Sequence, residues 1–316
     1  MGERLFEVAR ENDDRDQLLE AHHSLWPILV ERGEFAQART HLEQGYALYD
    51  PTKHRGLTFL YGDHDPGVCC RTIEAGRLWL TGFPDQALSA IEDAVRLARQ
   101  GAHPHTMGRA ICYAAVLHYW RGEIDAARAR AGEVVALSDQ HGIFTFFSVG
   151  AKLLAHLVAG ARPGLDELGA ELARLQTGGV LTRRVLLAML VAEAYGGAGQ
   201  PDRGLDVLAG ALKAVEAGAE RHYESEVHRL RGELRLAVGR GAEDAEACFR
   251  RAVASAQAIG GRSFELRAAT SLARRLADRG APVEARAALA PVLGAFTEGH
   301  HTRDLRTARA LLAEIG

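Results

Sequence analysis

The sequence is poor in the features that mark secreted, disulfide-rich and membrane-spanning proteins. Its 316 residues include only four cysteines, and no two of them form a CxxC pair. This excludes a disulfide framework and favours a reducing, cytoplasmic environment. No apolar run approaches the roughly 18 residues that a membrane-spanning helix needs. The first residues are charged and lack an apolar core, so we expect no signal peptide.

An excess of charge of one sign is also missing. The 38 Lys and Arg residues are balanced by 41 Asp and Glu residues, which gives a net charge of −3. Such a balance leaves no large basic surface to hold a nucleic-acid backbone or an anionic membrane. We therefore expect neither nucleic acid nor a membrane among the partners of this protein.

Strand signals and the common catalytic motifs are nearly absent as well. The sequence contains no GxxxxGK[ST], GxSxG or HExxH pattern, and no GxGxxG at a strand–helix junction. We therefore predict a protein that is not an enzyme and has no cofactor. What the sequence does contain is Ala, Leu, Arg and Glu at three- and four-residue spacing, which predicts an all-α fold.

A series of glycines divides this helical sequence into units of about forty residues. Each glycine follows one apolar helix and precedes the next, where a left-handed backbone ends a helix and only glycine adopts it without strain. In three units a proline follows two positions later and opens the next helix. The predicted turns lie at Gly33, Gly82, Gly122, Gly160, Gly199, Gly239 and Gly280.

Small residues recur in register with these turns, as closely crossing helices require. Ala75, Ala87 and Ala94 in one unit match the small positions of the tetratricopeptide repeat (TPR), and most other units show a similar set. A single helical hairpin cannot bury its own apolar face, so neighbouring hairpins must stack. The sequence therefore predicts one α-solenoid of about seven TPR-like helical hairpins over residues 1–316, with a capping helix at about 302–315.

The stretch YGDHDPGVCC places several chemically active side chains together. Asp65 and Pro66 suit the cap and first position of a helix. Cys69 and Cys70 are adjacent on that helix and point about 100° apart, which does not suit two ligands of one zinc ion. We interpret the stretch as a helix start with partly buried thiols. The enzymatic alternative, a nucleophile site of His64, Asp65 and Cys69, requires a depressed Cys69 pKa.

Two further groups of polar residues have simple interpretations. The histidines His22–His23, His103–His105 and His300–His301 lack the four-residue spacing of a helical metal pair, so we interpret them as polar surface and predict no metal site. The charges between Glu224 and Glu233 are interpreted as solvated ion pairs and contacts between repeats.

Eight segments of the chain form a series that is typical of one bacterial family. They are LLEAHHSLW (Leu18–Trp26), GEFAQARTHLEQGYALYDP (Gly33–Pro51), HDPGV (His64–Val68), FPDQAL (Phe83–Leu88), RLRGELRL (Arg229–Leu236), AEACFRRAV (Ala245–Val253), ELRAATSLARRL (Glu265–Leu276) and FTEGHHTRDLRTARALL (Phe296–Leu312). Together they resemble the C-terminal repeat region of large signalling ATPases of the STAND/AAA type, which often carry a class III adenylate or guanylate cyclase domain. The resemblance implies an arm that binds something and restrains or releases catalytic modules. It carries over no nucleotide-binding residue.

In tetratricopeptide arrays the first helix of each hairpin lines the inner surface. Transferring that register predicts a groove that is aromatic in its N-terminal half and charged in its C-terminal half. We hypothesise that it receives a protein or peptide segment, with the ATPase or cyclase modules of the same polypeptide as one candidate. Packing between hairpins is the alternative role of Trp79 and Tyr119. The candidate residues are Thr72, Trp79, Arg109, Cys112, Tyr119, Met189, Glu193, Glu226, Arg229, Glu233, Arg267, Thr270 and Arg274.

Two other functions stay open at this stage. A small-molecule-sensing arm of a transcription regulator would have a closed apolar pocket between its hairpins. A thiol or metal enzyme that uses the region from His64 to Cys69 would show rapid, selective alkylation of Cys69.

Overall fold

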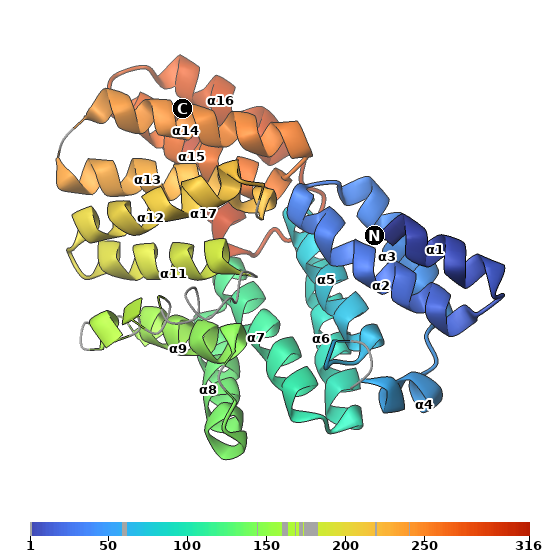
Figure 1. Ribbon diagram of the computed structural model, residues 1–316. Helices are drawn as coiled ribbons and strands as arrows, with labels where there is room; N and C mark the ends of the chain where they lie inside the picture. Colours follow the sequence, from blue (N-terminus) through green and yellow to red (C-terminus); the bar gives the residue numbers. More distant parts are fainter. Residues whose placement is uncertain are drawn as a thin grey trace.

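The structure is a computed structural model that describes residues 2–58, 62–143, 145–159, 164–167, 169–170, 173, 183–218, 220–239 and 241–316. Within these residues the regular elements are helices and there is no strand, which confirms the predicted all-α class (Figure 1). The elements are α1 (Gly2–Glu11), α2 (Arg15–Arg32), α3 (Phe35–Leu48), α4 (Pro51–His54), η1 (Arg55–Leu57), α5 (Pro66–Leu80), α6 (Pro84–Gly101), α7 (Pro104–Arg121), α8 (Ile124–His141), α9 (Phe146–Ala159), α11 (Arg184–Gly197), α12 (Pro201–Glu216), η2 (Arg221–Tyr223), α13 (Glu224–Val238), α14 (Ala242–Ile259), α15 (Arg262–Asp278), α16 (Pro282–Gly294) and α17 (Arg303–Ile315).

Most helices pack against their neighbour in the sequence as hairpins. The turn glycines take the left-handed conformation that the sequence predicts; Gly33 between α2 and α3 has a φ of 79°, and Gly122 between α7 and α8 has a φ of 83°. Gly82, Gly199, Gly239 and Gly280 also have positive φ values and lie between paired helices. Gly160 lies outside the described residues.

Small residues allow the paired helices to approach closely. Ala75, Ala87 and Ala94 are almost completely buried between α5 and α6. In the pair of α11 and α12, a Cβ atom added to Gly204 would lie 3.0 Å from the carbonyl oxygen of Ala192. A side chain at this position would therefore separate the two helices, which is the reason for a small residue in this register.

The two halves of the chain touch each other, so the inner surface is partly closed. The Ser263 hydroxyl of α15 donates a hydrogen bond to the carbonyl of Trp79 at the end of α5, 184 residues earlier. Arg267 donates to the carbonyl of Trp120 over 3.0 Å. The carboxylate of Glu298 accepts hydrogen bonds from two backbone N–H groups in the first turn of α6, at 2.8 and 3.1 Å. Helix α17 consequently packs against α7 as well as against α15 and α16, and it is more than an end cap.

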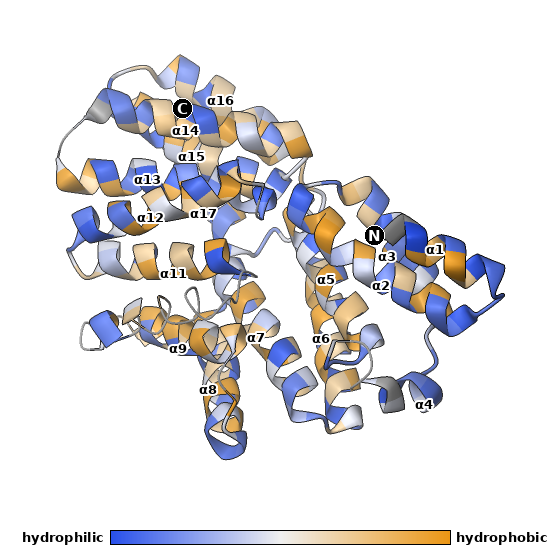
Figure 2. Cartoon of the chain, viewed as in Figure 1, coloured by the Kyte–Doolittle hydropathy of each residue, from blue (hydrophilic) through white to orange (hydrophobic). Residues whose placement is uncertain are grey.

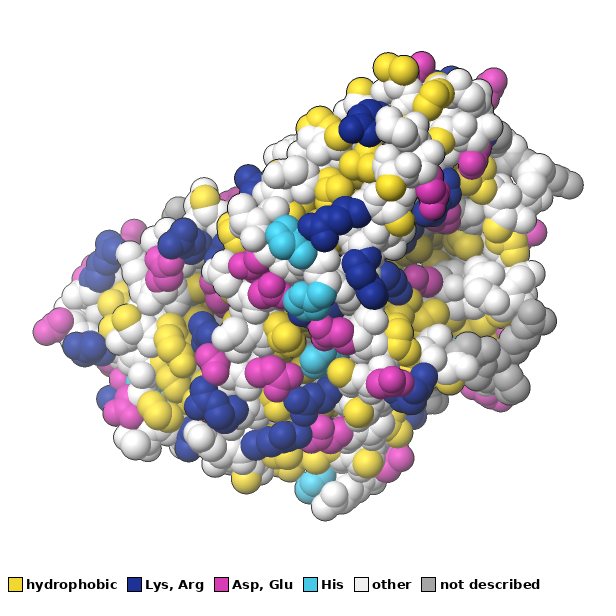
Figure 3. Space-filling model, turned by 180° about the vertical axis from the view of Figure 1, so that it is seen from behind, with side chains coloured by type: hydrophobic (Ala, Val, Ile, Leu, Met, Phe, Trp, Pro, Cys, Tyr) yellow, Lys and Arg dark blue, Asp and Glu magenta, His cyan; other side chains and the backbone are white. Residues whose placement is uncertain are grey.

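Apolar and charged residues are distributed as this packing requires. Figure 2 shows apolar stripes along the helices, as expected for helices that bury one side against a neighbour. On the face seen in Figure 3, basic and acidic side chains are intermixed. None of the helices in the described residues combines the length and the hydropathy needed to cross a bilayer.

Candidate functional site

A polar cavity of about 240 Å³ opens between the first helices of three hairpins and the C-terminal helix. Its walls come from α11, α13, α15 and α17, which are neighbours in Figure 1. Six of its ten lining residues belong to the predicted inner groove. The lining consists of Glu193, Arg229, Glu233, Arg267, Thr270, Ser271, Arg274, Arg303, Asp304 and Thr307.

Helical spacing explains why these side chains meet. Arg229 and Glu233 are four residues apart on α13, and Arg267, Thr270 and Arg274 follow at intervals of three and four on α15. Residues at this spacing share one face of a helix. Because α13 and α15 pack against each other, the two faces meet at the cavity.

Glu226 lies behind the cavity and fixes the positions of two of its arginines. Its carboxylate accepts two hydrogen bonds from Arg229, at 2.8 and 2.9 Å, and one from Arg267 at 3.2 Å. Burial raises the pKa of Glu226, but Arg229 and Arg267 outweigh burial and lower it to about 2. Glu226 is only 4% exposed, so its interpretation as a solvated charge was wrong, whereas its ion pair with Arg267 of α15 is a contact between repeats, as predicted. Two cations attached to one buried carboxylate are held in fixed positions.

Arg267 connects this network to the rest of the molecule. Its guanidinium donates to Asp304 of α17 at 2.6 Å, and its Cζ lies 5.1 Å from the ring centroid of Trp79. These contacts use most of its donors. Arg267 therefore lines the cavity, but most of its N–H groups are already bonded within the protein, so we assign it a structural role.

Two charged groups in the cavity have fewer hydrogen-bonding or oppositely charged partners than the others. Within the described residues, Arg274 forms no ion pair or hydrogen bond, and it is exposed at the cavity wall. Burial raises the pKa of Glu193, and the nearby Arg229 offsets this rise only in part. The hydroxyl of Tyr119 lies near the carboxyl of Glu193 and lowers its pKa, and Arg303 lies over the Tyr119 ring. The cavity therefore offers one unpaired cation and a half-buried carboxyl group.

Glu226 and Tyr119 contact lining residues of the cavity, whereas Trp79, Thr72, Met189 and Cys112 are buried among the helices and do not line it. Trp79 is 2% exposed and stacks on Trp120 with the ring centroids 4.5 Å apart, so it packs between hairpins. Thr72 is buried, and its hydroxyl donates to a carbonyl one turn earlier in α5. Met189 and Cys112 are buried as well. In the described part of the chain these side chains pack against neighbouring helices, and a cavity of about 40 Å³ beside Thr72 has room for a few water molecules.

Four lining residues were not among the residues predicted from the sequence: Ser271, Arg303, Asp304 and Thr307. Ser271 lies on the α15 face already identified and donates a 2.6 Å hydrogen bond to Glu233, so its spacing could have revealed it. The other three lie on α17. They reach the cavity because α17 packs against α15, and the spacing of the repeats does not predict this contact.

The YGDHDPGVCC stretch starts α5 as expected. Asp65 accepts a hydrogen bond from the Val68 N–H at 3.0 Å, and Pro66 is the first helical residue. Cys69 and Cys70 are completely buried, where partial burial was expected. Burial raises the pKa of the Cys69 thiol, but Arg109, His64 and His23 outweigh burial and hold it well below its usual value.

The interpretation of the histidine pairs as polar surface residues was wrong for one pair. His22 and His23 are buried, so they are not polar surface residues. His300 and His301 are exposed, in agreement with the expectation. The burial of His23 results from the packing of α2 on α5, which the sequence pattern of α2 alone does not disclose.

Comparisons with known proteins show the fold and leave the family open. No family model matches the chain. A protein of Rhizobium meliloti (strain 1021), described as "Uncharacterized protein R02095", is 24% identical over 272 residues, which cover 84% of this chain. The chain spans only 26% of the length of that relative.

Two solved structures resemble nearly the whole chain. One is a Rap protein complexed with Competence and Sporulation Factor, with a TM-score of 0.60 and 13% identity over 94% of this chain and 85% of that chain. The other is NprR in complex with its cognate peptide NprX, with a TM-score of 0.55 and 12% identity over 92% of this chain and 82% of that chain. These likenesses show that the chain has a TPR-like helical-repeat fold.

Proposed function

We propose that this chain is a non-catalytic TPR-type module that binds a protein or peptide segment in the cavity lined by α11, α13, α15 and α17. The observation that carries the proposal is the guanidinium of Arg274, which has no partner among the described residues and lies in a polar cavity where Glu226 fixes Arg229 and Arg267. The fold adds support, because Rap and NprR were each solved in complex with a partner, which for NprR is its cognate peptide.

The chemistry of the cavity favours a segment that carries a carboxylate. A guanidinium binds a carboxylate through two parallel hydrogen bonds, and a preorganised guanidinium loses little freedom on binding. Thr270 and Thr307 add hydroxyl groups that donate or accept hydrogen bonds. Glu193 and Glu233 could accept from the backbone N–H groups of the same segment.

The small-molecule alternative has less support from the described residues. It calls for a closed apolar pocket, and the apolar cavity beside Thr72 measures only about 40 Å³. Sites for drug-sized ligands usually measure about 300 Å³ or more. An extended segment that places only one or two groups in the polar cavity needs much less space.

The finer proposal is that the chain acts as the regulatory arm of a larger signalling ATPase, as the resemblance to STAND/AAA-type proteins implies. The length of the Rhizobium meliloti relative supports it, since this chain corresponds to only 26% of that protein. The bound segment would then belong to the ATPase or cyclase modules of the same polypeptide, or to a protein that signals to them.

Peptide binding tests the proposal directly. Peptides selected from a random library on the immobilised chain are labelled, and their dissociation constants are measured by fluorescence anisotropy. The variant Arg274→Glu should weaken binding by at least about tenfold, because it replaces a charged hydrogen-bond donor with a repelling charge. Arg286→Glu makes the same change at an exposed position of α16 and should leave binding unchanged. Equal affinities of the two variants would reject the cavity as the binding site.

A further inference from the structure

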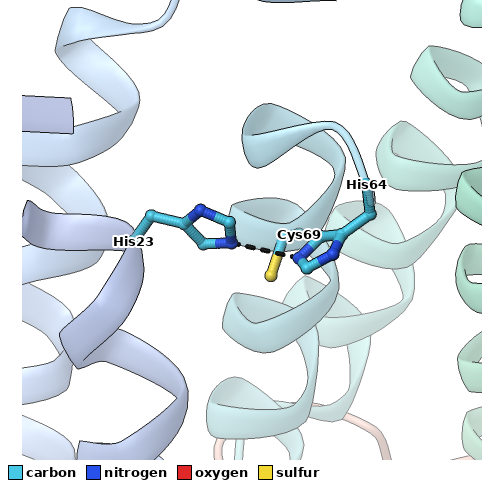
Figure 4. A group of neighbouring side chains, drawn as sticks. All are labelled: His23, His64 and Cys69. Carbon is cyan, nitrogen blue, oxygen red and sulfur yellow. Dashed lines mark hydrogen bonds between the residues drawn. The ribbon is translucent and has the colours of Figure 1, made fainter. Parts of the chain in front are cut away.

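Three potential metal ligands from two helices and the loop between hairpins meet at one point. His23 lies on α2, His64 lies in the loop before α5, and Cys69 lies in the first turn of α5 (Figure 4). Their ligand atoms all lie within 4.8 Å of one another, and the Nε2 atoms of the two imidazoles are 3.0 Å apart. His23 and His64 are 41 residues apart in the sequence.

The hydrogen bonds of the two imidazoles leave their Nε2 atoms available. The Nδ1 atom of His23 lies 2.9 Å from the carboxylate of Glu20, and the Nδ1 atom of His64 lies 2.7 Å from the carbonyl oxygen of Gly62. Both acceptors hold the ring proton on Nδ1. The two Nε2 lone pairs then face each other, and such an arrangement needs a proton or a cation between them. Metal-bound histidines usually have this second hydrogen bond to a carboxylate or a carbonyl.

Cys69 supplies a sulfur atom with the charge state that metals bind. The guanidinium of Arg109 lies 3.5 Å from its Sγ atom, and together with His64 and His23 it favours the thiolate. The carboxylate of Glu20 and the sulfur atom of Cys69 both lie close to the His23 ring, so the surroundings of the two imidazoles suit a cation.

We propose that His23, His64 and Cys69 form a binding site for Zn²⁺, with the two Nε2 atoms and Sγ as ligands and the fourth position open to water or to a ligand from outside. Two imidazoles and a thiolate select zinc and similar transition metals, and they exclude Mg²⁺ and Ca²⁺, which bind oxygen ligands. Zinc bonds of about 2.0 Å to nitrogen and 2.3 Å to sulfur place tetrahedral ligands about 3.3 to 3.6 Å apart. The imidazoles would have to separate by only a few tenths of an ångström, which half-buried His64 permits.

This site does not depend on the proposed peptide cavity, since none of its ligands belongs to α11, α13, α15 or α17. The sequence analysis considered Cys70 as the second ligand beside Cys69 and predicted no metal site. The proposed site uses His23 from the preceding hairpin and His64 in place of Cys70. A bound ion would join α2 to α5 and strengthen the contact between these two hairpins.

Cobalt substitution tests the site without any assay of function. The full chain is treated with a chelator, dialysed and titrated with Co²⁺, and the product is then titrated with Zn²⁺. We expect one Co²⁺ per chain, a thiolate-to-cobalt charge-transfer band, intense visible bands of four-coordinate cobalt, and their loss on addition of Zn²⁺. The zinc-loaded chain should also have a higher melting temperature than the metal-free chain.

Single substitutions identify the ligands. Cys69→Ser should abolish the charge-transfer band, and His64→Ala should weaken Co²⁺ binding by at least tenfold. His64 is half-buried in a loop, so His64→Ala decides the question if Cys69→Ser does not fold. Cys70→Ala is the matched control and should bind Co²⁺ as the unchanged chain does, because Cys70 points toward the carbonyl of Leu42. A chain without a charge-transfer band, or with the same band in His64→Ala, would show that the cluster is only an imidazolium–thiolate pair.

Discussion

Replacing Glu226 with glutamine should destabilise the folded chain by about 3 kcal/mol at pH 7. The pKa of this carboxyl falls from its usual value of 4.5 to about 2 in the folded state, because Arg229 and Arg267 outweigh its burial. Each pH unit of such a difference corresponds to about 1.4 kcal/mol of folding free energy. Removing one partner of a buried ion pair also typically costs about 3 to 5 kcal/mol, so both approaches give a similar value.

The pH dependence gives the sharper test of Glu226. Because its folded-state pKa is the lower one, ionised Glu226 stabilises the folded state fully above pH 4.5, and this stabilisation is lost as the pH falls toward 2. The difference between the unchanged chain and Glu226→Gln should therefore shrink to less than half at about pH 3. Urea unfolding followed by circular dichroism measures it, with Glu243→Gln on the exposed side of α14 as the control. A difference below about 1 kcal/mol at pH 7, or one that is the same at pH 3, would refute the role of the network.

Three further predictions follow from the packing. Trp79→Ala should cost about 3 to 5 kcal/mol, since it removes a buried ring that stacks on Trp120; a melting temperature close to that of the unchanged chain would contradict this. Glu298→Ala should cost about 1 kcal/mol through the loss of the cap on α6, and faster amide exchange in the first turn of α6 would show it; Glu284→Ala is the control. Cys69 should react slowly with iodoacetamide despite its low pKa, because it is only 1% exposed; rapid selective labelling in mass spectrometry would favour the thiol-enzyme alternative.

The sequence was a good guide wherever a feature repeats along the chain. The left-handed glycines and the small residues between paired helices follow from local backbone and packing requirements, and both are present in the structure. Several residues of the predicted charged half of the groove line one cavity. Arg229, Glu233, Arg267 and Arg274 meet at one cavity because their spacing on α13 and α15 sets the direction of their side chains.

The repeat pattern did not predict the contacts between distant parts of the chain. The aromatic residues expected in an open groove are buried because α15 lies against α5. Asp304 reaches the cavity, and His23 reaches Cys69, through packing that joins different hairpins. A repeat pattern predicts how each hairpin is built, but the curvature that brings two ends together is the sum of many small rotations that single residues do not encode.

The contact between the two halves has a consequence for folding. In an open solenoid each unit touches only its neighbours, so folding can begin anywhere and end units can be deleted with a local loss. Here the Asp85 carboxylate accepts from the N–H of Gly299, 214 residues further along the chain. Contacts of such separation close a very large loop and slow folding. Deleting α17 should therefore expose side chains of α7, and the contacts of α5, α6 and α7 with α15, α17 and the loop before α17 can form only after residues 263–304 have been synthesised.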